Sequence, residues 1–202
     1  MTRFRARLIL LGVVVVALVA YRVTRHPFPS DRTPEGAYLR VAKAVNQDRP
    51  EDFFAYLETP AQHAAYSIRD YRKKARDRVL ATYPEPERTR LAAAYAADAT
   101  AADGPDLFRT YAVRRGFVAL LRRDLSGVAK TETVGERATV ETVRGTRYAF
   151  RRRENGIWGL TLFTPALTAD AEKAARDYQL IDRAASDYER VGGVHASSHD
   201  GG

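Results

Sequence analysis

The spacing of hydrophobic and polar side chains changes along this chain of 202 residues. Residues 8–21 form an uncharged, largely apolar run, and residues 34–125 repeat apolar side chains at intervals of three and four. Residues 128–163 alternate apolar with polar side chains, and residues 168–191 return to the longer interval. Intervals of three and four are typical of helices that bury one face, whereas alternation is typical of strands. The pattern predicts an apolar segment followed by one α+β domain over residues 34–191.

The apolar run at residues 8–21 has arginines on both sides. As a helix it would measure about 21 Å, short of the roughly 30 Å hydrocarbon core of a bilayer. Residues 4–23 would reach about 30 Å if the flanking guanidinium groups extend to the headgroups. We therefore predict a flank and uncleaved transmembrane anchor over residues 1–25, with a linker at residues 26–33. The arginines that flank the membrane are Arg3, Arg5, Arg7, Arg22 and Arg25.

Two other interpretations of this run remain open, a cleaved signal peptide and a buried core helix. Cleavage favours small residues and a polar lead-in, but the candidate site after Ala20 has Leu18 two residues earlier. A lipoprotein anchor would need a cysteine, and the sequence has none. The positive-inside rule is nearly balanced between the two flanks. We expect the N-terminus inside the bacterial inner membrane and the domain outside it, because a single early anchor usually exports the rest of the chain.

The formal net charge of +8 would suit a nucleic-acid partner if it lay on the domain. Residues 1–32 carry six arginines and one aspartate, hence +5, and residues 33–202 carry 27 basic and 24 acidic side chains, hence +3. Most of the excess therefore belongs to the membrane flank, where it suits anionic lipid, and nucleic acid is not expected as a partner. The absence of cysteine excludes disulfides, thiol catalysis and thiolate metal sites.

Prolines mark the starts of the predicted helices. Thr33 before Pro34 is typical of a helix cap, and the break at residues 46–49 precedes a second, short helix. Thr59 and Pro60 repeat the arrangement before a third helix. That helix is expected to run to about residue 82, with Ala64, Ile68, Tyr71, Ala75 and Val79 on one side and Arg72, Lys73, Lys74, Arg76 and Arg78 on the other. An alanine-rich fourth helix and a fifth over residues 106–125 follow.

Four strands are predicted at residues 128–134, 137–143, 146–152 and 157–163. We expect a two-residue type II′ turn at Gly135, and three-residue loops that end in left-handed Gly145 and Gly156. These loops give an antiparallel meander with helices on one face. Its predicted inner face consists of Ala129, Thr131, Thr133, Ala138, Val140, Thr142, Tyr148, Phe150, Trp158, Leu160 and Leu162. On its outer face, one row across the four strands consists of Lys130, Glu141, Arg147 and Phe163.

The last helix is predicted over residues 168–191, with Gly192 and Gly193 ending it and a disordered tail at residues 192–202. Its apolar positions form a heptad-like seam. The seam either covers the sheet of its own domain or makes a coiled-coil contact between two copies. The seam residues are Ala171, Ala174, Tyr178, Ile181, Ala185 and Tyr188.

Residues 33–57 (TPEGAYLRVAKAVNQDRPEDFFAYL) resemble the start of small envelope proteins of the nuclear transport factor 2-like superfamily. The closing strands, which end in GIWGLTLF, are similar to that family as well. The resemblance implies a sheet that curls round the first helix to form a cone with a pocket. Two features depart from the family: residues 60–125 are expected to contain helices and no strand, and a long helix follows the sheet. Members include enzymes and plain binding modules, so the resemblance implies no single function.

Candidate chemistry is sparse. No phosphate-loop, dinucleotide, nucleophile-elbow or zinc-protease motif occurs in the sequence. His63 either forms an acid–base pair with Asp70 or is a surface histidine. His195 and His199 have the spacing of a helical metal pair, but a glycine- and serine-rich tail gives that helix no reason to form. Arginine pairs at positions 114–115 and 122–123, with the triplet at 151–153, form either a basic patch or an ordinary charged surface.

Tyr148, Phe150 and Trp158 share one face of the predicted sheet. They either line a ligand pocket or belong to the core together with Leu160 and Leu162. The carboxylates Glu132 and Glu141 are interpreted as part of a solvated charge ladder. We expect a membrane-anchored, non-enzymatic envelope protein with an exported domain for an unknown protein partner or for scaffolding. The alternative is a small-molecule-binding module or enzyme of the nuclear transport factor 2-like kind. No cofactor or metal is expected.

Overall fold

A computed structural model describes residues 28–197 of the backbone and the side chains of residues 28–191. The chain divides into two compact units, Met1–Ser30 and Asp31–Gly202, and every described helix and strand belongs to the second. The predicted anchor at residues 4–23 and its flanking arginines lie outside the described residues. Within the part that is described, no helix is both long enough and apolar enough to cross a bilayer.

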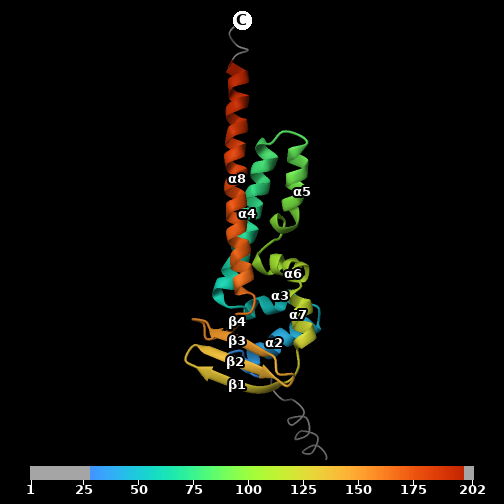
Figure 1. Ribbon diagram of the computed structural model, residues 1–202, viewed down its shortest axis with the longest axis vertical. Coiled ribbons are helices and arrows are strands. Elements are labelled where there is room, and N and C mark those ends of the chain that lie inside the picture. The colour runs from blue at the N-terminus through green and yellow to red at the C-terminus, as the bar shows by residue number, and fades with distance from the viewer. Residues whose placement is uncertain (1–27, 198–202) are drawn as a thin grey trace, which may run out of the picture. The chain divides into compact units, whose positions relative to one another are not determined.

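Helices and one antiparallel sheet make up the second unit, which confirms the α+β class (Figure 1). The helices are α2 (Pro34–Asn46), α3 (Pro50–Phe53), the 3₁₀ helix η1 (Phe54–Tyr56), α4 (Thr59–Thr82), α5 (Glu87–Ala99), α6 (Gly104–Arg114), α7 (Phe117–Asp124) and α8 (Thr164–Ser197). The strands, in spatial order, are β1 (Val128–Val134), β2 (Arg137–Thr142), β3 (Arg147–Arg152) and β4 (Trp158–Leu160). The predicted meander and the long C-terminal helix are both present.

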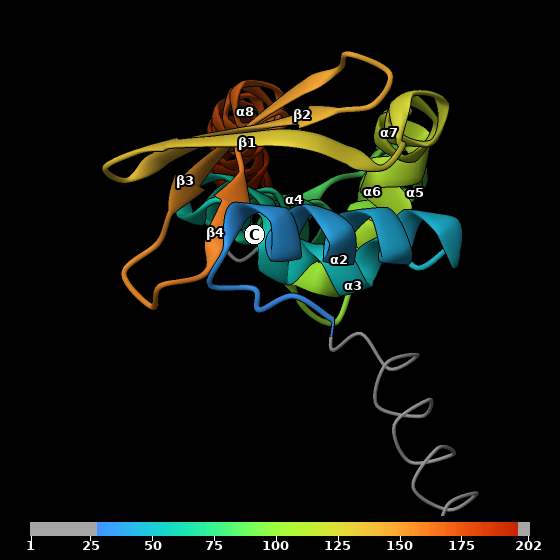
Figure 2. The same ribbon diagram turned by 90° about the horizontal axis from the view of Figure 1, so that it is seen from below.

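The sheet register follows from its turns, as predicted. Val134 pairs with Arg137 across a turn in which Gly135 has a φ of 57°. Gly145 and Gly156 have φ values of 81° and 82° and end three-residue loops. Tyr148 therefore pairs with Val140 on the buried face. Helix α2 lies against that buried face (Figure 2). The other face of the sheet carries the predicted charges.

Two details of the predicted faces are wrong. A bulge between Val128 and Lys130 sets Val128, not Ala129, opposite Thr142, so that Val128 packs against the core. At the other end, β4 stops at Leu160, and the chain turns through residues 161–163 into α8. Because the alternation ends there, Leu162 is 44% exposed and Phe163 is only 2% exposed, the reverse of the prediction.

Two of the predicted helices among residues 33–125 also differ from the structure. Thr33 does cap α2 by accepting a bond from the Gly36 amide, but the capping position of α4 is Glu58 rather than Thr59. Glu58 is extended there because its N–H donates to the Leu160 carbonyl. The expected fifth helix is divided into α6 and α7 by Gly116, whose φ of 73° lies in the left-handed region. The break lets Phe117 stack on Phe163, with ring centroids 4.1 Å apart.

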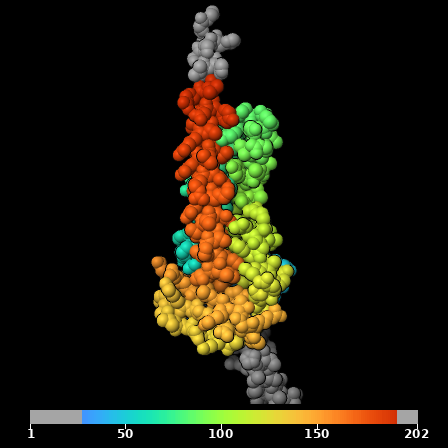
Figure 3. All heavy atoms as spheres, viewed as in Figure 1, coloured from blue at the N-terminus to red at the C-terminus, as the bar shows by residue number. Residues whose placement is uncertain are grey.

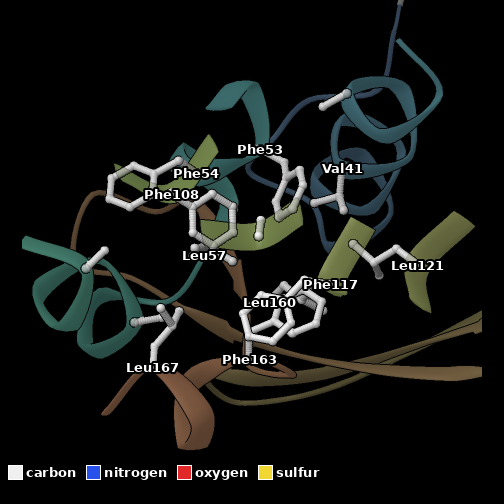
Figure 4. Close-up of a cluster of buried hydrophobic side chains, with 14 of the residues drawn as sticks. Val41, Phe53, Phe54, Leu57, Phe108, Phe117, Leu121, Leu160, Phe163 and Leu167 are labelled. Carbon is white, nitrogen blue, oxygen red and sulfur yellow. The ribbon is translucent and has the colours of Figure 1, made fainter. Parts of the chain in front are cut away.

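The larger core lies between the sheet and helices α2, α3, α6 and α7. Its centre is aromatic: Phe53 meets Phe108 edge to face at 5.1 Å, with Leu57 and Leu160 beside them (Figure 4). A smaller core joins α4, α5 and α8. It is made of alanines and a few larger side chains, namely Ala75, Val79, Tyr83, Ala92, Ile181 and Ala185.

Helix α8 begins four residues earlier than predicted and continues past Gly192 and Gly193 to Ser197. Its seam packs on α4 rather than on the sheet, and the two helices run side by side in the same direction (Figure 1). Ion pairs flank the seam: Arg72 bonds Asp177 at 2.7 Å and Arg78 bonds Asp182 at 2.9 Å. Figure 3 shows α8 and α5 at the surface, with the strands gathered at one end of these helices. The seam is thus used within the chain.

Candidate functional site

An open groove lies where the outer face of the sheet meets the first turns of α4. It consists of two adjoining pockets with volumes of about 510 and 360 Å³, and both are lined by Glu58 and Arg151. We call it the arginine groove, because its lining side chains include Arg137, Arg151, Arg152 and Arg153. The remaining lining residues are Thr59, Pro60, His63, Glu154, Asn155, Ala138, Thr139, Ala149, Phe150 and Thr161.

The groove forms where the segment at Leu57 and Glu58 lies alongside β4. Leu57 forms a parallel bridge with Leu160, and the Glu58 N–H donates to the Leu160 carbonyl at 3.2 Å. Gly159 permits this approach, since a Cβ atom there would lie 2.5 Å from the Glu58 Cα. The start of α4 is thereby held against the edge of the sheet. Glu58 occupies the space that a side chain at position 159 would fill.

Arg137 and Arg151 lie directly opposite each other on the outer faces of β2 and β3. Both are exposed, and neither guanidinium group makes a hydrogen bond or an ion pair with any residue that the structure describes. Like charges placed opposite each other across two strands destabilise a sheet. Two unpaired guanidinium groups at one place form a ready contact for a carboxylate or phosphate group.

Arg153, unlike Arg137 and Arg151, is hydrogen-bonded within the domain. Its Nη1 donates to the Ala55 carbonyl at 2.7 Å and its Nη2 donates to Gln62 Oε1 at 3.0 Å. Gln62 in turn donates to the Phe54 carbonyl at 2.8 Å. Burial lowers the pKa of Arg153. Arg153 therefore fastens the end of β3 to η1 and α4, and it shapes the groove rather than offering a free charge.

Glu58 is the buried acid of the groove. Its residue is 7% exposed, and its carboxylate has no hydrogen-bond or ion-pair partner among the described residues. It also makes no side-chain cap to α4. The carboxylate lines both pockets of the groove and is not engaged by any described side chain.

His63 is exposed on the wall of the groove. Of the two interpretations of His63, the structure agrees with a surface histidine, and Asp70 is paired with Arg69 at 2.9 Å. His195 lies within the backbone of α8, but its side chain and the whole of His199 are outside what the structure describes. No group of three or more His, Asp or Glu side chains within the described range is arranged to hold a metal ion.

The three predicted ligand-binding residues lie in the larger core. Tyr148, Phe150 and Trp158 are 4%, 2% and 4% exposed. Tyr148 packs on Tyr38 with ring centroids 5.4 Å apart, and burial raises its pKa to about 12. Trp158 Nε1 donates to the Arg32 carbonyl at 3.1 Å. The structure brings the three to one buried face, and Phe150 also borders the arginine groove.

The arginine pairs at positions 114–115 and 122–123 are engaged in ion pairs. Arg114 bonds Asp98 at 2.7 Å, and Arg115 lies 3.2 Å from Asp170. Arg122 bonds Asp48, and Arg123 bonds Asp124. These arginines make an ordinary charged surface, in contrast to Arg137 and Arg151. Arg137 did not stand out in the sequence, although the predicted register already sets it opposite Arg151.

Comparisons with known proteins leave the groove to be interpreted from its own geometry. No protein-family model, no curated protein and no solved structure matches this chain. The resemblance to the nuclear transport factor 2-like superfamily accordingly stays a prediction.

Proposed function

We propose that this chain is a non-enzymatic envelope protein, held at the bacterial inner membrane by residues 4–23. We propose further that its exported domain binds an acidic segment of a partner protein in the arginine groove. One observation supports the binding proposal above others: Arg137 and Arg151 lie opposite each other, exposed and unpaired, in the part of the chain that the structure describes. An incoming carboxylate would relieve the repulsion between them and gain charge-assisted hydrogen bonds.

The form of the groove favours a protein segment over a small molecule. Its two pockets are open to solvent and adjoin each other along the sheet, whereas small-molecule sites usually enclose most of the ligand. The aromatic residues that would make such a site apolar are packed in the core. An extended peptide can cross an open groove and contact its charges in sequence.

The membrane attachment is supported by the sequence alone. Residues 8–21 carry no charge, and arginines stand on both sides of them. Such a tether would confine the groove to a thin layer beside the bilayer, which raises its effective concentration toward partners in the same membrane. A topology reporter fused after Val191 tests this part of the proposal. A cytoplasmic signal from the reporter would contradict the exported location.

A second candidate function is a small-molecule-binding module or enzyme. The larger pocket, at about 510 Å³, falls in the usual size range of ligand sites, roughly 300–1,000 Å³. It also brings His63 and Glu58, two side chains capable of acid–base chemistry, to one wall. Stabilisation of the domain by a small anion at low concentration would favour this alternative over a peptide.

The binding proposal is tested with residues 28–202 and a hexaglutamate peptide as the probe, followed by NMR titration. We expect amide shifts around Thr139 and Arg151, with affinity reduced about tenfold in Arg137→Glu and Arg151→Glu variants, as the loss of one charged contact implies. The matched control is Arg183→Glu, because Arg183 is also exposed and without an ion pair in the described region, but lies on α8. Equal losses in all three variants would show non-specific attraction and would overturn the proposal.

A further inference from the structure

We propose that the arginine groove also has a site for a positive charge, and that Glu58 provides it. The bound acidic segment would then carry a basic side chain beside its acidic ones. This inference rests on the proposed function of the groove. It concerns the one feature that simple attraction between arginines and an acidic peptide leaves unexplained, the carboxylate of a largely buried residue, Glu58, in the same wall.

Glu58 does not serve the helix that it precedes. The residue before a helix usually caps it through a short oxygen-bearing side chain such as that of Ser, Thr, Asp or Asn. Glu58 holds this position for α4, yet its side chain makes no capping bond. Only its backbone makes structural contacts: the Glu58 N–H donates to the Leu160 carbonyl, and the Glu58 carbonyl accepts from the Gln62 N–H. The carboxylate is therefore available for another role.

The neighbouring arginines do not neutralise it. Arg152 lies 3.7 Å from Glu136, and Arg153 is engaged with Ala55 and Gln62. Arg137 and Arg151 line the same pocket as Glu58, but neither forms an ion pair with it. A single pocket thus contains an unpaired acid and two unpaired bases, all from described residues. Nearby opposite charges that stay apart are well placed to bind a ligand with both signs.

The spacing of these charges indicates what the ligand looks like. Arg137, Arg151 and Gly159 form one row across three strands, and Glu58 fills the space above Gly159. Neighbouring strands are about 4.8 Å apart, and side chains two residues apart on an extended peptide are about 7 Å apart. A segment with an acidic residue and, two positions later, a lysine or arginine would place its carboxylate over the arginine pair and its cation beside Glu58.

Two blocked peptides serve as probes, Glu-Glu-Gly-Lys and Glu-Glu-Gly-Gln, titrated into residues 28–202. We expect the lysine peptide to bind the native domain about fivefold more tightly, the ratio that one modest ion pair supplies. In the Glu58→Gln variant this preference is expected to disappear, while both peptides still bind. The matched control is Glu154→Gln, because Glu154 lines the same groove but is exposed. It should retain the preference.

A second measurement does not depend on any peptide. If Glu58 is held ready for a cation and makes no bond within the domain, the Glu58→Gln domain should melt at the temperature of the native domain or above it, because no contact is lost. A lower melting temperature would assign Glu58 a structural role and overturn the inference. Binding of both peptides without a lysine preference would also overturn it, and would leave the proposed function standing. If neither peptide binds the native domain or the variant, the proposed function itself fails.

Discussion

Gly159 of β4 lies directly against Glu58 at the start of α4, so closely that a Cβ atom on Gly159 would be 2.5 Å from the Glu58 Cα and 2.6 Å from its backbone nitrogen. Both of these atoms belong to the backbone, which cannot swing aside as a flexible side chain can. The contact joins the helical part of the domain to the sheet and sets the position of the groove wall. A residue with no side chain is required here for steric reasons, since Gly159 does not have a positive φ.

Replacing Gly159 by alanine is therefore expected to lower the free energy of unfolding by about 1–3 kcal/mol, the usual effect of overpacking. Urea denaturation of residues 28–202 measures it. Gly127→Ala is the control, because a Cβ there would meet only the Val143 Cγ2, at an ordinary 3.6 Å. We expect the control to change stability by less than about 1 kcal/mol, since glycine-to-alanine changes at compatible positions have small effects. Similar losses in both variants would contradict the steric role of Gly159.

The end of the sheet gives a second prediction. Phe163 is 2% exposed and stacks on Phe117, whereas its neighbour Leu162 is 44% exposed. Phe163→Ala should lower the free energy of unfolding by about 3–5 kcal/mol, the typical range for a buried phenylalanine. Leu162→Ala should cost less than about 1 kcal/mol, because surface substitutions usually have small effects. Chemical denaturation of the two variants measures these losses. A larger loss of stability in Leu162→Ala than in Phe163→Ala would mean that Leu162 is the buried residue, as the alternating pattern predicts.

The burial of Phe163 in place of Leu162 shows where a local sequence pattern stops predicting the structure. The register from Val134 to Trp158 was predictable because it depends on turns of two and three residues, whose glycines reveal the loop length. The faces of Leu162 and Phe163 were not, because the chain leaves the sheet after Leu160 to begin α8. Alternation has no meaning once the strand has ended. A tertiary contact, the stacking on Phe117, decides which of the two side chains is buried.

The arginine groove also has one part that the local sequence predicts and one part that it does not. Arg137 and Arg151 lie opposite each other in the predicted register, so this part of the site could be predicted from the local sequence. The burial of Glu58 does not follow from any local pattern. It requires the segment at Leu57 to lie alongside β4, roughly a hundred residues further along the chain, and no periodicity predicts such a contact. The same holds for the seam of α8, whose residues were identified correctly but whose partner turned out to be α4.

The break between α6 and α7 supplies a third prediction. Gly116 has a φ of 73°, and a Cβ there would meet nothing within 4 Å, so conformation alone is the constraint. Gly116→Ala should destabilise the domain by about 1–2 kcal/mol, the strain of a left-handed residue with a side chain. Gly116→Asn should cost less, because asparagine tolerates this region. Thermal unfolding of both variants makes the comparison, and equal stability of the native and alanine forms would show that the loop can rearrange.

The contact between α4 and α8 should depend on pH through Asp177. Burial alone would raise the pKa of this carboxyl group, but hydrogen bonds from Lys173 and Arg72 outweigh it and hold the pKa below its ordinary value. A carboxyl group whose pKa is depressed in the folded state adds stability above its unfolded pKa of about 3.9. That stability is lost as the pH falls through the lower, folded value. The ion pair with Arg72, at 2.7 Å, is the contact that acid would break.

We therefore expect Asp177→Asn to be less stable than the native domain at pH 7 and to approach it at pH 3, because the carboxyl group of the unfolded chain takes up a proton below its pKa of about 3.9. Urea denaturation at the two pH values measures the difference, which should shrink on acidification because only the native form loses a charge there. Glu172→Gln is the matched control: Glu172 also lies on α8 but is largely exposed, 3.7 Å from Arg176. Its effect should be small at both pH values, as for most surface pairs. A stability gap for Asp177→Asn that stays constant between pH 7 and pH 3 would mean that packing, rather than charge, joins the two helices at this point.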